Sequence, residues 1–190
     1  MREIQERLDQ LFGSLILPSP TELLEAFGVL NISIEDLSAY LGPAGSFPYH
    51  RKLLFKNDQV EVLVMNWAKG QMCSPHDHGE SFGLIEIVTG VATHHLYTLN
   101  QLDSPVQYYS RVETEQSRYF TAKNSIHAMG NLTEDFLVTL HVYTPPICNM
   151  KVYDLEQCAA CVVSDDCGAW WPAESRQILK RIRLRRVPAR

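Results

Sequence analysis

The chain has 190 residues, of which 45% are hydrophobic and 21% are charged, with a formal net charge of −5. This size and composition are typical of one globular domain that buries its own core. No apolar run approaches the ~18 residues of a membrane span. The first twelve residues mix charged and apolar side chains, so we do not expect a signal peptide. We therefore predict a cytoplasmic protein whose five cysteines are free thiols.

The charge is unevenly distributed along the chain. Residues 176–190 contain seven Lys or Arg and no acidic residue. A basic end of this kind can bind nucleic acid or an acidic partner. The simpler interpretation, which we favour, is a charged strand or tail that lies on its own acidic domain.

Three helices are predicted in the first 48 residues. The apolar residues of Ile4–Phe12 fall on one helical face. The segment Ser19–Glu22 is a capping box with Pro at the first helical position, and Gly28 is a plausible end of this second helix. Ser33 is the expected N-cap of a third, short helix.

From Tyr49 onward the hydrophobic period is that of strands. The expected strands are Tyr49–Lys56, Gln59–Ala68, Phe82–Thr89, Val91–Leu99, Val106–Val112, Tyr119–Thr121 and Phe136–Tyr143. Many short strands separated by turn residues favour a mainly β fold, a small β-barrel or jelly roll of the cupin kind, with N-terminal helices. Within one domain we expect a helical segment packed on the barrel (1–48), the barrel itself (49–155) and a C-terminal extension (156–190).

Two histidines, His76 and His78, lie one residue apart between Gly70 and Gly90. In a strand, residues i and i+2 point to the same face, so we expect both imidazoles to approach one divalent metal. The spacing resembles the first cupin motif, except that Gly83 stands where that motif usually has a Glu ligand. The alternative is that these are surface or core histidines without a metal.

A third histidine, His127, matches the end of the second cupin motif because Asn131 follows it by four residues. Three neutral imidazoles leave a divalent metal with open positions, and this ligand type admits Fe, Zn, Cu or Ni. Glu80 and Glu86 are close in sequence. If Glu86 points inward, it becomes a candidate fourth ligand outside the motif.

Two further sets of residues have the spacing of one strand face. Thr139, His141 and Tyr143 can form a hydrogen-bond relay inside a barrel, or a buried polar ladder that only satisfies itself. Tyr49 and Arg51 form the second set, on the first predicted strand. An inward Arg requires an anion such as a substrate carboxylate, whereas an edge-strand Arg would lie in solvent.

Taken together, these four segments resemble the cysteine dioxygenases, which are non-haem iron cupins. The resemblance covers roughly residues 49–150 and implies a mononuclear Fe(II) cofactor and the oxidation of L-cysteine by O2 to cysteine sulfinate, a step of cysteine catabolism. It implies metal ligands His76, His78 and His127, substrate-binding residues Arg51 and Tyr49, and catalytic residues Tyr143, His141 and Thr139.

Other assignments remain open beside this one. The substrate can be another small thiol acid, 3-mercaptopropionate or mercaptosuccinate, although Arg51 argues against the relatives that carry Gln there. A non-catalytic cupin that binds a metal and a small acid is a different class of function. We expect a small thiol and O2 as partners, no nucleic acid or membrane, and a monomer or weak oligomer.

The glycine at position 83 also bears on the type of enzyme. Animal cysteine dioxygenases have at this place a Cys that cross-links to the Tyr, so Gly83 indicates the bacterial type with an unmodified Tyr143. The remaining cysteines, Cys148, Cys158, Cys161 and Cys167, admit a zinc cluster or a redox pair. We favour ordinary thiols, and we expect Trp170 and Trp171 to serve packing.

Overall fold

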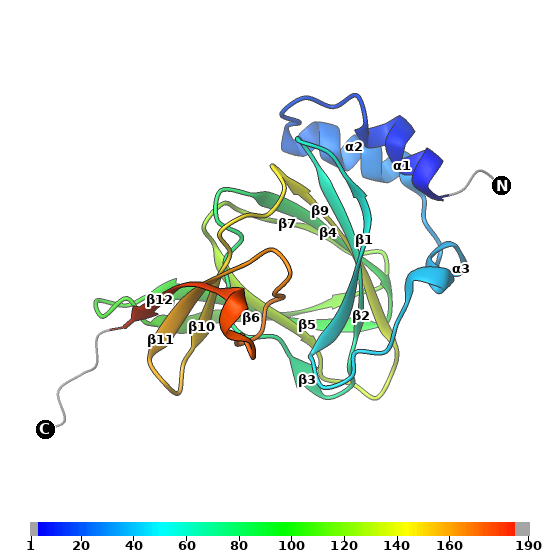
Figure 1. Cartoon of the computed structure of the whole chain (residues 1–190). Coiled ribbons are helices and arrows are strands. Elements are labelled where there is room, and N and C mark those ends of the chain that lie inside the picture. Colours follow the sequence, from blue (N-terminus) through cyan, green and yellow to red (C-terminus); the bar gives the residue numbers. More distant parts are fainter. Residues whose placement is uncertain (1–3, 185–190) are drawn as a thin grey trace, which may run out of the picture.

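The computed structural model describes residues 4–184 as a mainly β protein with helices at its N-terminal end (Figure 1). The helical elements are α1 (Ile4–Phe12), α2 (Pro20–Leu30), α3 (Ile34–Leu37) and the 3-10 helices η1 (Ser38–Tyr40) and η2 (Ser175–Gln177). The strands are β1 (Tyr49–Lys56), β2 (Glu61–Trp67), β3 (Gln71–Met72), β4 (Phe82–Thr89), β5 (Val91–Leu99), β6 (Pro105–Thr114), β7 (Arg118–Thr121), β8 (Ile126–Asn131), β9 (Leu137–Thr144), β10 (Lys151–Asp154), β11 (Ala159–Val163) and β12 (Ile178–Arg183).

Two antiparallel sheets form the body of the molecule. One has the strand order β1-β2-β9-β4-β7, and the other has the order β3-β8-β5-β6. They face each other across a shared interior, in which Leu63 of β2 and Ile85 of β4 pack with Met129 of β8 (Figure 1). This arrangement confirms the predicted jelly roll. A third sheet, β10-β11-β12, lies on the far side of the barrel from α1 and α2.

The central strand β9 is covered on both faces. All eight of its residues are buried. Its outward side chains, including Leu140 and Val142, pack with Leu8 of α1 and Phe27 of α2. The inward side chains alternate with these and reach the barrel interior. The N-terminal helices therefore stabilise the strand that carries Thr139, His141 and Tyr143.

The predicted helix starts agree with the structure, but one predicted helix end does not. Ser19 and Ser33 each form a reciprocal capping box with the third helical residue. Helix α2 continues past Gly28 to Leu30, so the predicted end at Gly28 is wrong. Asn31 adopts the left-handed conformation at φ 40° and ends the helix instead, because its short polar side chain tolerates that conformation.

The predicted strands recur as β1, β2, β4, β5, β6, β7 and β9 with small shifts at their ends. Sequence reasoning assigned no strand to β3, β8, β10 or β11. Strand β8 is buried at all six positions, so it lacks the apolar–polar alternation that identifies a half-buried strand. The other three have two to five residues each, which is too short for a periodicity to be recognised.

The basic C-terminal segment begins as a strand. β12 pairs with β11, and Arg176 before it forms ion pairs with Asp166 and Glu174. These contacts agree with the expected charged strand on the protein's own surface. The remaining basic residues, 185–190, lie outside the described residues. In the part of the chain from residue 4 to residue 184, every helix is too short or too polar to cross a membrane.

Candidate functional site

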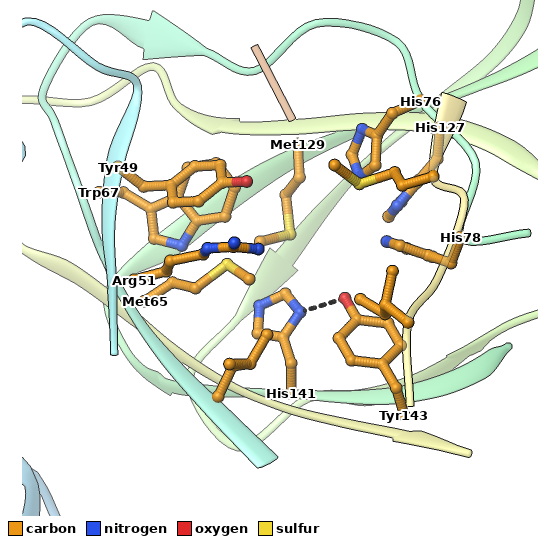
Figure 2. Close-up of a pocket in the computed structure, with 13 residues that line it drawn as sticks. Tyr49, Arg51, Met65, Trp67, His76, His78, His127, Met129, His141 and Tyr143 are labelled. Atoms are coloured by element: carbon orange, nitrogen blue, oxygen red, sulfur yellow. Dashed lines mark hydrogen bonds between the residues drawn. The ribbon is translucent and has the colours of Figure 1, made fainter. Parts of the chain in front are cut away.

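The three predicted ligand histidines meet in the barrel interior, although they come from two segments far apart in the sequence. His76 lies in an extended loop between β3 and β4 rather than in a regular strand. Its backbone forms an isolated antiparallel bridge with His127 of β8, with N–O distances of 2.9 and 3.0 Å. This bridge places the side chains of His76, His78 and His127 together, with potential ligand atoms within 4.8 Å of one another (Figure 2).

The protonation state of these histidines suits a metal. All three are buried, and burial lowers the pKa of His76 to about 4 and the pKa values of His78 and His127 well below their usual range. The rings are therefore neutral, as metal ligation requires. His78 Nδ1 and His127 Nε2 are buried without a hydrogen-bond partner among the described residues. Unpaired imidazole nitrogens in such a cluster fit a divalent cation.

The loop that carries His76 and His78 is anchored by the residue between them. Asp77 is 1% exposed, and its Oδ1 accepts hydrogen bonds from the backbone amides of Gly79 and Lys151, at 3.0 and 3.2 Å. Its Oδ2 lies 3.2 Å from Lys151 Nζ. These bonds attach the histidine loop to β10. Sequence reasoning missed Asp77, although its place between two candidate ligands was a signal for such a role.

Gly83 lies on β4 directly opposite Tyr143 of β9. A Cβ at this position would lie 2.6 Å from Tyr143 Cε1 and 2.8 Å from Thr121 Oγ1, closer than real Cβ contacts allow. A Glu ligand or a Cys therefore requires the Tyr143 ring to move. The ring occupies the space of the missing carboxylate ligand, and Gly83 offers no sulfur for a thioether.

The two nearby glutamates do not join the histidines. Glu86 pairs with Arg118 at 2.9 Å, and both residues line a surface groove beside α3. The hypothesis of Glu86 as a fourth ligand is therefore wrong, because its side chain points out of the barrel. Glu80 is exposed and lies 3.5 Å from the Asn124 amide.

The three predicted relay residues form a continuous hydrogen-bond chain on β9. Thr139 Oγ1 lies 2.7 Å from His141 Nε2. His141 Nδ1 lies 2.9 Å from the Tyr143 hydroxyl, as the dashed line in Figure 2 marks. Trp67 of β2, which sequence reasoning did not assign to the relay, donates its Nε1–H to Thr139 Oγ1 at 2.8 Å. The chain therefore has four members, all buried.

The partners of Thr139 set the direction of this chain. Trp67 can only donate, so the buried Thr139 hydroxyl can donate its own proton only to His141 Nε2. Burial lowers the pKa of His141 to about 3, so its ring is neutral and carries its single proton on Nδ1. This Nδ1–H donates to the Tyr143 oxygen. Burial raises the pKa of Tyr143 well above its usual range, so Tyr143 keeps an O–H that the relay does not use.

Tyr49 and Arg51 line the same cavity as the histidines, on the side opposite to them (Figure 2). Both contact residues 164–171, which we call the strap. The Tyr49 hydroxyl accepts a 2.7 Å hydrogen bond from the backbone amide of Ala169, and Arg51 Nη2 donates to the backbone carbonyl of Asp165. The predicted inward orientation of Arg51 agrees with this position. Trp170 packs on the Tyr49 ring, as expected for a packing residue.

The cavity itself is small and mostly apolar. Its free volume is about 20 Å³. Beside the polar residues above, the lining consists of Leu63, Met65, Met129, Ile147 and Met150. The described lining includes one guanidinium and no carboxylate. A small anion that reaches both Arg51 and the histidines is the ligand that this charge distribution favours.

The C-terminal cysteines form no metal cluster within residues 4–184, where the three histidines are the only group with metal-ligand geometry. All five cysteines are free. Cys161 and Cys167 are buried in an apolar cluster with Met150 and Val152. Burial raises the pKa of Cys167 to about 11, so it remains a protonated thiol. These features agree with ordinary packed thiols rather than zinc ligands.

A family model described as cysteine dioxygenase type I matches residues 46–156, which is more than half of the chain. The chain belongs to the cysteine dioxygenase type I family. The matched range contains Tyr49, Arg51, the three histidines and the relay of β9, but not the strap. The family predicted from the sequence is thus confirmed.

Individual relatives are distant. The cysteine dioxygenase type 1 of Danio rerio is 24% identical over 114 residues, which are 57% of either chain, so the chain spans little more than half the length of this family member. An uncharacterised conserved protein from Klebsiella pneumoniae with a double-stranded β-helix domain has a TM-score of 0.51 at 15% identity, covering 60% of this chain and 90% of its own. This second similarity supports the cupin fold alone.

Proposed function

We propose that this protein is an iron-dependent thiol dioxygenase that adds both atoms of O2 to the sulfur of L-cysteine and forms cysteine sulfinate. One observation carries the proposal: a single small cavity combines three neutral imidazoles, a guanidinium and a phenol. The imidazoles suit a metal, the guanidinium suits a carboxylate, and the phenol lies against one of the imidazoles, with 4.6 Å between the ring centroids of Tyr143 and His78.

The proposed cofactor is a mononuclear non-haem Fe(II) held by His76, His78 and His127. Bound iron would supply the positions at which a thiolate and O2 meet, and the electrons that activate O2. Because all three ligands are neutral, they leave the full charge of the cation to favour the thiolate over the thiol. The carboxylate of Glu86 pairs with Arg118 and is not a ligand that would reduce that charge.

Arg51 is the proposed binding residue for the substrate carboxylate. In the structure its guanidinium donates to the carbonyl of Asp165, a neutral acceptor. A carboxylate forms stronger, charge-assisted bonds and can accept two of them from one guanidinium. The Tyr49 hydroxyl accepts from Ala169 and keeps its own O–H to donate to the same carboxylate. Together these groups favour thiols that carry a carboxylate.

Tyr143 is the proposed catalytic residue, positioned by His141, Thr139 and Trp67. The relay uses the lone pair of the phenol oxygen and leaves its O–H proton free. Tyr143 can therefore donate a hydrogen bond to negative charge that develops on oxygen or sulfur in the cavity. The lining around the phenol is mostly apolar, which strengthens that hydrogen bond.

The direct test measures O2 consumption by the Fe(II)-loaded protein with L-cysteine, together with detection of cysteine sulfinate. The same assay with 3-mercaptopropionate and mercaptosuccinate identifies the preferred thiol. Turnover of L-cysteine with the highest kcat/KM is the expected result. A protein that oxidises only another thiol acid contradicts the substrate assignment. A protein that binds Fe(II) and oxidises none of the three is a non-catalytic cupin.

The cellular setting belongs to the proposal as well. We place the enzyme in the cytoplasm, because free thiols and Fe(II) both persist in a reducing compartment. We propose that it works as a monomer or weak oligomer on a small thiol and O2, without nucleic acid or membrane partners. Residues 1–48, 49–155 and 156–190 are proposed as the helical, barrel and C-terminal parts of one domain.

A further inference from the structure

The three histidines of the proposed metal site differ in the hydrogen-bond partners of their Nδ1 atoms. His76 Nδ1 lies 2.9 Å from the backbone carbonyl of Ser74. His78 Nδ1 has no hydrogen-bond partner among the described residues. His127 Nδ1 lies 2.8 Å from Nε2 of another histidine, His94. The Cys73 sulfur also lies 3.8 Å from His76 Nδ1, so His127 has the closer side-chain partner of these two ligands.

His94 has a defined environment on the outer side of His127. It lies on β5, is 1% exposed, and packs against the Tyr119 ring with 4.7 Å between ring centroids. Arg111 of β6 places its Nη2 3.4 Å from His94 Nδ1 and itself pairs with Glu113. A neutral imidazole has one donor and one acceptor nitrogen.

The neutral His94 ring can bond to His127 in two ways, with opposite consequences for a metal. If His127 donates from Nδ1 to His94 Nε2, His127 Nε2 carries a lone pair toward the cavity. If His94 donates from Nε2 instead, the proton of a neutral His127 lies on Nε2 and blocks the metal position. The Ser74 carbonyl can only accept, and at 2.9 Å it is closer to His76 Nδ1 than the Cys73 sulfur at 3.8 Å, so it favours a proton on His76 Nδ1.

We infer that His94 is a positioning residue that selects the metal-binding tautomer of His127 by accepting its Nδ1–H. The inference rests on the proposed metal site. It places the single proton of His94 on Nδ1, the nitrogen that faces Arg111. Outer partners of this kind orient a ligand and typically change metal affinity by 10–100-fold.

Arg111 has the opposite effect in this arrangement. A guanidinium has no acceptor, so it cannot bond to the protonated Nδ1 that the metal-bound state requires of His94. It bonds well only to the other tautomer, in which His127 Nε2 is blocked. Arg111 therefore favours the metal-free site, and its side chain is 34% exposed, so the effect is screened and small.

The opposite signs give a test that separates tautomer selection from packing. Co(II) affinity of the full chain is measured by competition with a chelator, and the visible absorption of Co(II) reports its coordination. His94→Leu should weaken Co(II) binding by roughly 10–100-fold. His94→Gln, whose amide oxygen accepts the same hydrogen bond, should bind more tightly than His94→Leu. Arg111→Met should bind roughly 2–5-fold more tightly than the wild type.

Three results would overturn the inference: wild-type affinity in a folded His94→Leu protein, equal losses in His94→Leu and His94→Gln, or weaker binding by Arg111→Met. Should the leucine variant not fold, nitrogen-15 NMR of histidine tautomers in the Zn(II)-loaded wild type decides. A proton on His94 Nδ1 supports the inference, and a proton on Nε2 contradicts it. A different result would refute the proposed metal site itself: no Co(II) binding by the wild type, and the same absence of binding in His76→Ala.

Discussion

The two ends of the cavity are built in different ways. At the histidine end, His76 and His127 are joined by a backbone bridge, and Asp77 anchors the loop between two of the rings. At the opposite end, Arg51 and Tyr49 contact main-chain groups of the strap, which lies more than a hundred residues away in the sequence. The histidine end is thus held mainly by β8 and β10, with one strap contact from Ser74 N to Ala169 O at 2.9 Å, whereas the functional side chains of the other end bond directly to the strap.

The two ends of the cavity also differ in burial and charge. The histidine end is fully buried and consists of neutral rings with lowered pKa values. The other end carries a cationic side chain that is only partly buried and is held by a carbonyl. We expect changes at the histidine end to abolish metal binding and changes at Arg51 to alter which thiol is bound. The predictions below test that division.

The largest effect is expected from removing a ligand. His127→Ala removes one of three imidazoles, so the purified protein should not retain stoichiometric iron, and its dioxygenase activity should fall below detection. Iron analysis and O2 consumption check this. His95→Ala, a partly exposed histidine beside His94 on β5, is the matched control and should behave like the wild type. Full iron content in His127→Ala would contradict the assigned ligand set.

The next largest effect concerns the phenol that lies between the two ends. Tyr143→Phe keeps the ring and removes the hydroxyl, so kcat should fall by roughly 10²–10⁴-fold while iron is retained. Steady-state O2 consumption and iron analysis measure both quantities. Tyr108→Phe, on the exposed face of β6, is the control. Unchanged kcat in Tyr143→Phe would reduce the relay to a structural polar ladder.

A smaller effect, confined to binding, is expected at the carboxylate end. Arg51→Ala removes two charge-assisted hydrogen bonds, so KM for L-cysteine should rise by roughly 100-fold with iron content intact. Arg51→Lys keeps the charge without the forked geometry and should give an intermediate KM. If Arg51→Ala loses its iron, the two ends are not independent and the assignment of β1 is wrong.

The smallest effect is one of packing. Gly83→Ala forces a Cβ to within 2.6 Å of the Tyr143 ring, so the free energy of unfolding should fall by about 1–3 kcal/mol. Gly28→Ala is the control, because its Cβ would meet nothing closer than 3.9 Å inside helix α2, and it should stabilise the protein by about 0.5–1 kcal/mol. Urea unfolding measures both. If the two variants had equal free energies of unfolding, the Tyr143 ring would have to move aside for the new Cβ without a cost in stability.

The sequence contained what local spacing can encode. The i, i+2 spacing of His76 and His78 and of Tyr49 and Arg51 follows from extended backbone, and the structure places each pair toward the cavity. The alternation along β9 likewise predicted its polar inner face. These side-chain directions depend only on the two-residue period of a strand, so they can be predicted without knowledge of the tertiary structure.

Other parts of the site could not be read in this way. His94 contacts His127, which is 33 residues away in the sequence. Its neighbour His95 has the same side chain but lies on the other face of the strand, where it is partly exposed. Trp67 joins the relay across 72 residues. The strap contacts depend on backbone groups, which carry no residue signature. Such contacts depend on strand register and on the path of the C-terminal segment, and neither is specified by local periodicity.

The strap has a consequence for where this chain can be truncated. A fragment that ends at residue 156, where the family match stops, would contain every residue proposed for catalysis. It would still leave Arg51 without the Asp165 carbonyl and Tyr49 without the Ala169 amide. A fragment that keeps both contacts extends at least through Ala169. To transfer this site to another cupin, one would have to transfer the strap together with the cavity residues that it contacts, Tyr49 and Arg51.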